Sequence, residues 1–214
     1  MRGRVGYGNK STSRRPYLLG LNWKGISMDI DFLLSSFLLS SNNVSKDLIS
    51  ANEPQIWIIT GPRSAGKTTL CNNIVNTCRK NDLQVAGVLS HAQIEGRNKT
   101  GIILENLKNS EQRLLGSKDK IPGSSIKVGV WNFSQDTVSW GNNCLELAAN
   151  EDVVIFDECG FLELFDNNGF VAGLRLFDNR KFKFGIIVIR PELLILAKKR
   201  WPSAHVHTVE GVSG

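Results

Sequence analysis

The sequence predicts an α/β fold in which a mostly parallel central sheet packs against helices. One basis is an apolar run, Gln55–Thr60, that leads through a glycine-bounded loop into a helical pattern. The second is another apolar run, Val153–Phe156, which ends in two carboxylates. The third is the continued alternation of strand-like and helix-like segments towards the C-terminus, which indicates parallel strands joined by crossover helices.

The first strand, loop and helix carry the most specific pattern. Ile56–Ile59 is continuously apolar, as in a strand buried on both faces. Gly61 and Gly66 bracket four residues and Lys67-Thr68 follow at once, which is the pattern of a phosphate-binding loop. Downstream, apolar residues recur at helical spacing, as Leu70, Ile74, Val75 and Cys78.

The chemistry of phosphate binding explains this spacing. Backbone N–H groups of the loop can surround a phosphate, and the helix directs its positive N-terminal end at the same anion. We expect Lys67 to reach the β- and γ-phosphates and the Thr68 hydroxyl to ligate Mg²⁺. The residues predicted to contact a nucleotide such as ATP or GTP are Gly61, Pro62, Arg63, Ser64, Ala65, Gly66, Lys67, Thr68 and Thr69.

The second apolar run supplies the acids that such a loop requires. We expect it to form a strand beside the loop strand, with Asp157 on the magnesium side of the site. Glu158 is then placed to accept a proton from an attacking water. The acidic motif alone is weak evidence, but in the same chain as the phosphate-binding loop it predicts an enzyme that acts on nucleotides.

The remaining elements complete the expected architecture, a P-loop NTPase three-layer sandwich with a mostly parallel central sheet and a β-hairpin insertion. The strand candidates are Val85–Ser90, the hairpin Thr100–Leu107 with Glu111–Leu115, Ser125–Phe133, Phe184–Arg190 and Ala204–Glu210. The helix candidates are Thr137–Asn150, Gly169–Asp178 and a segment from Pro191.

The charge distribution separates the N-terminus from the rest. The chain has 26 Lys and Arg against 20 Asp and Glu; six of the bases and none of the acids lie in residues 1–27. The sequence therefore predicts a disordered basic tail at 1–27, an N-terminal helix and linker at 28–54, and a P-loop NTPase domain at 55–214. Because the basic excess belongs to the tail, nucleic acid is an unlikely partner.

The cysteines and the apolar segments bear on compartment. The four cysteines contain no C-x-x-C pair, which favours buried free thiols in a reducing, cytoplasmic setting. The apolar run Phe32–Leu39 is too short to span a bilayer, so no membrane association is expected. The oligomeric state is open, with a monomer favoured.

Three segments together resemble a known family. Gly61–Thr69, Val85–Ser90 and Val154–Glu163 are similar to the small nucleoside-triphosphatase family known from thermophiles, which includes the cancer-related nucleoside triphosphatase. The resemblance implies Mg²⁺-dependent hydrolysis of ATP, GTP and other nucleoside triphosphates to diphosphates with broad base tolerance. Lys67, Thr68, Asp157 and Glu158 match the family pattern position by position. The chain is divergent, because Cys159, Phe161 and Leu162 replace the usual Ile, Pro and Met.

Arginines and a histidine near strand ends are further candidates. Arg190 ends a strand at the edge where ligands bind, so it is the better candidate to stabilise charge on the departing phosphate. Arg97 is a weaker candidate, and Arg63 within the loop is expected to face solvent. His91 is expected to make a structural hydrogen bond.

Two alternative functions stay open. A nucleoside or nucleotide kinase would use the same phosphate cradle but would need an arginine-rich lid, and the predicted hairpin offers only Arg113. A slow nucleotide-dependent switch would use the helix at 30–39 and the basic tail to dock on a partner.

Overall fold

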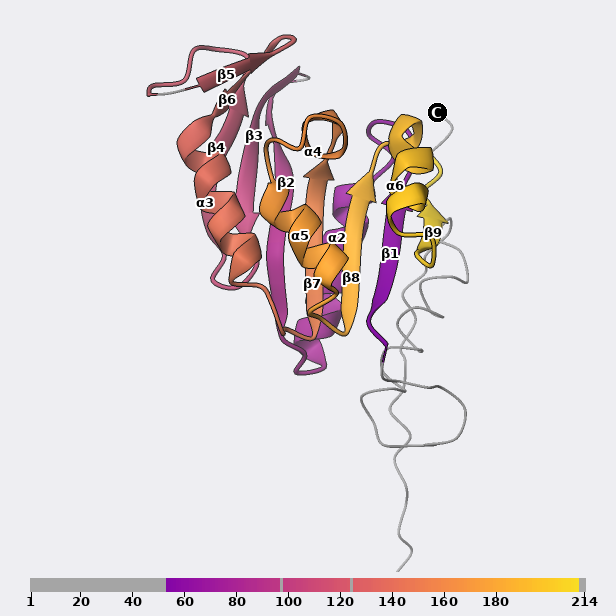
Figure 1. Ribbon diagram of the computed structural model, residues 1–214. Helices are drawn as coiled ribbons and strands as arrows, with labels where there is room; N and C mark the ends of the chain where they lie inside the picture. The colour runs from indigo at the N-terminus through magenta and orange to yellow at the C-terminus, as the bar shows by residue number, and fades with distance from the viewer. Residues whose placement is uncertain (1–52, 97, 124, 212–214) are drawn as a thin grey trace, which may run out of the picture.

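The computed structural model describes residues 53–96, 98–123 and 125–211, and the tail and helix predicted before residue 53 lie outside this part. In the described part the strands form one sheet in the order β5-β6-β4-β3-β2-β7-β8-β1-β9 (Figure 1). The strands are β1 (Gln55–Thr60), β2 (Val85–Glu95), β3 (Asn98–Asn106), β4 (Glu111–Ser117), β5 (Ser125–Val128), β6 (Trp131–Ser134), β7 (Val153–Cys159), β8 (Phe184–Ile189) and β9 (His205–Thr208).

The helices occupy the connections between strands. They are α2 (Lys67–Lys80), α3 (Gln135–Glu146), α4 (Phe161–Leu164), α5 (Val171–Asn179), the 3₁₀ turn η1 (Pro191–Leu193) and α6 (Leu194–Arg200). α2 lies on one face of the sheet, whereas α3, α5 and α6 lie on the other (Figure 1).

The sheet has a parallel half and an antiparallel half. Strands β2, β7, β8, β1 and β9 pair in parallel. Strands β2, β3, β4, β6 and β5 pair in antiparallel fashion, with β2 shared between the halves. The sheet is therefore mixed, and the predicted parallel arrangement holds for the half that contains β1 and β7.

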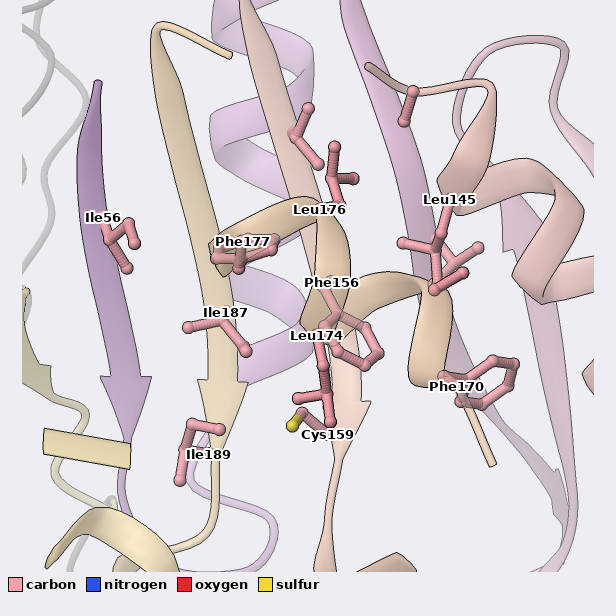
Figure 2. Packing of buried hydrophobic residues seen from close by; sticks show 14 of the residues in the cluster. Ile56, Leu145, Phe156, Cys159, Phe170, Leu174, Leu176, Phe177, Ile187 and Ile189 are labelled. Atoms are coloured by element: carbon pink, nitrogen blue, oxygen red, sulfur yellow. The ribbon is translucent and has the colours of Figure 1, made fainter. Parts of the chain in front are cut away.

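Burial on both faces explains the continuous apolar runs of the parallel strands. In β1, Ile56 and Ile58 belong to the core under α5, while Trp57 and Ile59 belong to the core under α2. Figure 2 shows the first of these cores, in which Phe156 of β7 lies among side chains from neighbouring strands and helices. Complete burial of each such side chain contributes about 1.5–3 kcal/mol.

The structure differs from the sequence prediction at the edge of the antiparallel half. The expected single strand at 125–133 is two strands, β5 and β6, that pair antiparallel around a turn at Gly129. Gly129 has φ +60, a left-handed conformation that reverses the chain. The alternating apolar residues Ile126 and Val128 continue into Val130, so the turn is hidden in the sequence pattern.

Candidate functional site

The strand order brings the two sequence motifs to one edge of the sheet but does not make their strands neighbours. β8 lies between β1 and β7 and pairs in parallel with both. The expectation that the acidic strand lies beside the loop strand is therefore wrong. All six residues of β8 are apolar or glycine and buried, which suits the centre of a parallel sheet.

The loop between β1 and α2 is held close to the C-terminal end of the chain. Gly61 has φ +140, and a Cβ at this position would lie 2.2 Å from the carbonyl oxygen of Val209. Only glycine permits both this conformation and this approach. Val209 N–H in turn donates to Thr60 O at 2.8 Å, so backbone contacts fix the start of the loop.

Lys67 is the first residue of α2, and its side chain lies over the loop. Its Nζ donates to the carbonyl oxygens of Gly61 at 2.8 Å and Pro62 at 2.6 Å. The ammonium group therefore lies over the first turn of the loop, whose residues are predicted to bind phosphate.

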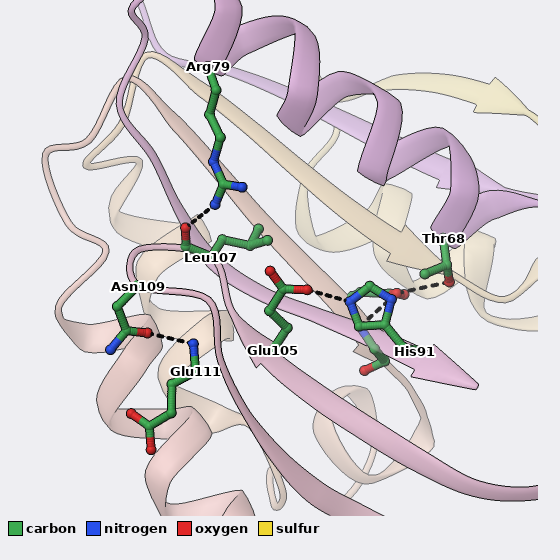
Figure 3. A network of polar contacts seen from close by, with 9 residues as sticks. Thr68, Arg79, His91, Glu105, Leu107, Asn109 and Glu111 are labelled. Carbon is green, nitrogen blue, oxygen red and sulfur yellow. Dashed lines mark hydrogen bonds and ion pairs between the residues drawn. The ribbon is translucent and has the colours of Figure 1, made fainter. Parts of the chain in front are cut away.

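Thr68 and Asp157 meet although they come from different motifs. Thr68 Oγ1, in the first turn of α2, donates to Asp157 Oδ2 at 3.1 Å (Figure 3). The same carboxylate oxygen accepts the backbone N–H of Ser90 at 3.3 Å. Asp157 is 3% exposed, and these contacts offset part of the cost of burying a carboxylate.

Ser90 is a contact that the sequence analysis did not assign. It follows the apolar run of β2 at the same edge of the sheet as Asp157, and its hydroxyl is buried without a hydrogen-bond partner. A polar residue directly after a buried apolar run is the signal that could have identified it.

The field of Asp157 extends to a neighbouring thiol. Burial raises the pKa of Cys71 well above its ordinary value, and the negative charge of Asp157 raises it further. Cys71, Cys78, Cys144 and Cys159 are all buried free thiols, which confirms the prediction made for them.

The other predicted site residues are placed as follows. Glu158 belongs to β7 directly after Asp157, and its side chain lies outside the described part of the structure. Arg190 directly follows β8 and is exposed. Because β8 lies between β1 and β7, Arg190 lies between the strand that leads to the loop and the strand that carries Asp157. Arg63 is exposed in the loop, as expected, and Arg97 is outside the described residues.

His91 makes the structural contact that was expected of it. Its Nε2 lies 2.6 Å from Glu105 Oε2 on the adjacent strand β3 (Figure 3). The sequence did not identify Glu105 as the partner, because the pairing depends on the register between β2 and β3.

The described part of the chain offers only small sets of side-chain ligands for a metal ion. Among the side chains described in residues 53–96, 98–123 and 125–211, which exclude that of Glu158, no group of three or more His, Cys, Asp or Glu could hold a metal ion. The Thr68 hydroxyl and Asp157 carboxylate are hard oxygen donors, the type that Mg²⁺ takes together with water and substrate phosphates. The donors present therefore fit a magnesium ion that is shared with a nucleotide.

Comparison with known families defines the class of protein. A family model described as NTPase matches residues 56–199, which include the loop, the acidic strand and β8. The chain belongs to this NTPase family.

Two relatives have the same name. The nucleoside-triphosphatase THEP1 of Caldivirga maquilingensis is 28% identical over 106 residues, which cover 50% of this chain and 59% of the relative. The nucleoside-triphosphatase THEP1 of Methanopyrus kandleri is 29% identical over 123 residues, which cover 57% of this chain and 66% of the relative. The chain thus spans less than two thirds of the length of each of these relatives.

Solved structures support the same fold. The crystal structure of THEP1 from Aquifex aeolicus has a TM-score of 0.57 and 25% identity, covering 73% of this chain and 90% of that protein. The solution structure of a human cancer-related nucleoside triphosphatase has a TM-score of 0.56 and 17% identity, covering 72% and 88%. Both show a likeness to the α/β fold described above.

In the described part of the chain, no helix is both long enough and apolar enough to cross a bilayer.

Proposed function

We propose that the protein hydrolyses nucleoside triphosphates, including ATP and GTP, to diphosphates and phosphate with Mg²⁺ and with broad base tolerance. The observation that carries the proposal is the 3.1 Å contact between Thr68 and Asp157. It joins the helix that follows the glycine-bounded loop to the acid that ends β7. Membership of the NTPase family supports the same reaction.

Residues 55–214 form the proposed catalytic domain. Its helices on both faces of the sheet would correspond to the three-layer arrangement of P-loop NTPases, with the β3–β4 hairpin as an insertion. Its buried free thiols favour a cytoplasmic setting.

Thr68 and Asp157 are the proposed magnesium ligands. A magnesium ion bound there together with phosphate oxygens would neutralise part of the negative charge of the triphosphate. Ser90 N–H would keep the Asp157 carboxylate oriented, since it already donates to Oδ2.

Lys67 and the loop residues Gly61–Thr69 are the proposed phosphate ligands. On nucleotide binding, Lys67 Nζ would exchange its carbonyl partners, Gly61 and Pro62, for phosphate oxygens. The exchange is favourable because a phosphate oxygen carries more negative charge than a carbonyl oxygen. The first N–H groups of α2 would contribute further hydrogen bonds.

Glu158 is the proposed general base. It would accept a proton as the water oxygen attacks the γ-phosphorus in line, and the bond between that phosphorus and the β–γ bridging oxygen would break. Arg190, at the end of β8, would stabilise the charge that develops on the departing groups.

The alternative functions have less support. A kinase would need cationic groups free to close over the transferred phosphate. In the hairpin, Arg113 instead donates to Glu111 at 2.7 Å and lies 4.5 Å from the ring centroid of Trp140. The switch hypothesis depends on residues 1–39, which lie outside the described part.

Phosphate release tests the proposal directly. ATP, GTP, CTP and UTP are supplied with and without Mg²⁺ to the wild type, Lys67→Ala and Glu158→Gln. We expect release by the wild type with all four nucleotides only when Mg²⁺ is present. Both variants should lose release, and Glu158→Gln should still bind nucleotide. A wild type that binds nucleotide but releases no phosphate would contradict the proposal.

A further inference from the structure

The segment that follows the acidic strand is organised around one buried carboxylate. Glu163 belongs to the short helix α4 and is 4% exposed. Its Oε2 accepts the N–H of Gly160 at 2.8 Å, and its Oε1 accepts the N–H of Phe170 at 2.9 Å. A buried carboxylate that accepts backbone N–H groups makes strong, charge-assisted hydrogen bonds, so Glu163 fixes both ends of the segment.

Both of these contacts lead to the proposed catalytic acids. Gly160 comes two positions after Glu158, so its hydrogen bond fixes the backbone on the C-terminal side of the acid pair. Phe170 packs edge-on against Phe156, with ring centroids 6.3 Å apart and an interplanar angle of 82° (Figure 2). Because Phe156 directly precedes Asp157, the second contact supports the N-terminal side of the pair.

The backbone around Glu163 leaves room for its carboxylate only because residue 169 is glycine. Gly169 has φ +71, and a Cβ there would lie 2.2 Å from Glu163 Oε1. A side chain at this position would therefore move the carboxylate away from Phe170 N–H.

A second anchor holds the same segment but does not reach Gly160. Asn142 of α3 donates through Nδ2 to Gly169 O at 2.8 Å. Its Oδ1 accepts the N–H of Ala172 at 2.8 Å. Asn142 thus fixes the start of α5 and offers a comparison for a purely structural role.

We propose that Glu163 is a positioning residue for Glu158, and that hydrolysis depends on it while nucleotide binding does not, because Asp157 is held separately by Thr68 and by Ser90 N–H. The inference rests on the proposed function. Glu163 is bonded to the backbone at Gly160, after the pair, and reaches Phe156, before the pair, only through the ring of Phe170. The proposed phosphate ligands lie in the separate loop Gly61–Thr69. Loss of its contacts should consequently lower kcat and leave KM and the nucleotide Kd unchanged.

Glu163→Gln is the first variant to measure. It keeps the shape of the side chain but places an NH₂ group against a backbone N–H, so one of the two hydrogen bonds is lost. We expect kcat per folded protein to fall between about 10-fold and 100-fold, as for other small misplacements of catalytic groups. KM and the nucleotide Kd should stay within about twofold of wild type on the same grounds.

Gly169→Ala tests the same contact without removing the carboxylate. It should also lower kcat with KM unchanged, and it decides the matter if Glu163→Gln does not fold. Asn142→Ala is the comparison variant. It releases the Gly169–Phe170 peptide from α3 but keeps both acceptor oxygens of Glu163, so the melting temperature should fall and kcat per folded protein should fall less than in Glu163→Gln. Glu146→Gln, at an exposed ion pair with Arg175, should change neither quantity.

The outcomes separate this inference from the proposed function. A wild type that releases no phosphate overturns both. If the wild type is active, a wild-type kcat in Glu163→Gln or in folded Gly169→Ala overturns the positioning role alone. A fall in kcat for Asn142→Ala equal to that for Glu163→Gln would show general loosening of the segment and would also overturn it.

Discussion

The two halves of the sheet differ in what their strand ends can bring together. In the parallel half, β1, β7 and β8 all end at the same edge, so the loop, Asp157 and Arg190 gather there although they are far apart in sequence. In the antiparallel half, successive strands end at opposite edges, and its polar contacts include surface pairs such as Glu111 with Arg113. A parallel arrangement concentrates chemistry at one edge, and an antiparallel one distributes it.

The largest expected effect is the loss of triphosphate hydrolysis when Lys67, at the end of the parallel strands, is replaced. Lys67→Ala should lower kcat/KM for triphosphate hydrolysis at least about a hundredfold, because it removes a cation from the proposed phosphate site. Lys99→Ala is the control: Lys99 lies over the Trp131 ring in the antiparallel half, and activity should be unchanged. Steady-state phosphate release measures both. Equal losses in the two variants would remove the distinction between the halves.

A second comparison uses two glycines with positive φ. Gly61→Ala should lower the free energy of unfolding by about 3 kcal/mol or more, because its Cβ would meet Val209 O at 2.2 Å and the conformation is strained. Gly129→Ala, in the β5–β6 turn, should cost only about 1–2 kcal/mol, since its Cβ would meet nothing within 4 Å. Urea denaturation measures both values. If Gly129→Ala lowered the free energy of unfolding as much as Gly61→Ala, the close backbone approach of Val209 would not be what requires glycine at position 61.

The buried thiols under the parallel half of the sheet should make the free energy of unfolding fall at alkaline pH. Burial, aided by the charge of Asp152, raises the pKa of Cys78 to about 12. Because the folded pKa lies above the unfolded value, the stabilisation is complete below pH of about 8.5 and declines as the pH rises towards 12. By pH 10 the loss should be about 1–2 kcal/mol from this thiol.

The alkaline effect can be isolated with one variant. Urea denaturation at pH 8 and pH 10 should show a smaller drop in the free energy of unfolding for Cys78→Ala than for the wild type. Other groups titrate in both proteins, so the difference between them reports the thiol. Equal drops would mean that the thiol ionises as readily in the folded protein as in the unfolded chain.

The smallest effect is expected in the antiparallel half. Arg113→Ala removes an exposed ion pair with Glu111 and a contact with Trp140, so it should cost at most about 1 kcal/mol and leave hydrolysis unchanged. Thermal unfolding and phosphate release check the two statements. A large loss of phosphoryl transfer would instead favour the kinase alternative, in which this arginine acts on the phosphate.

The parts of the fold that follow from local pattern could be predicted from the sequence. β1, the loop and α2 follow from an apolar run, glycine spacing and helical periodicity, and β7 follows from an apolar run that ends in acids. The position of β8 between β1 and β7 could not be predicted, because strand order depends on pairing between distant segments. Both β1 and β8 show the same continuous apolar pattern, which is compatible with either order.

The limits at the candidate site have a similar cause. The motifs predict that Thr68 and Asp157 share one magnesium site, and their side chains are in contact. The contact of Ser90 N–H with Asp157 and that of Glu163 with Phe170 depend on register and on the path of a loop. Sequence identifies the residue types, but it does not say which backbone groups lie opposite them.

The most direct test of the central claim is a double-mutant cycle on Thr68→Ala and Asp157→Asn, read as the Mg²⁺ dependence of the nucleotide Kd. If Thr68 and Asp157 bind the same magnesium ion, each single variant should lose most of the nucleotide affinity that Mg²⁺ adds. The double variant should then lose no more affinity than the more severe single variant. Affinity without Mg²⁺ should be similar in all four proteins. Losses that multiply in the double variant would show two independent sites and would contradict the account.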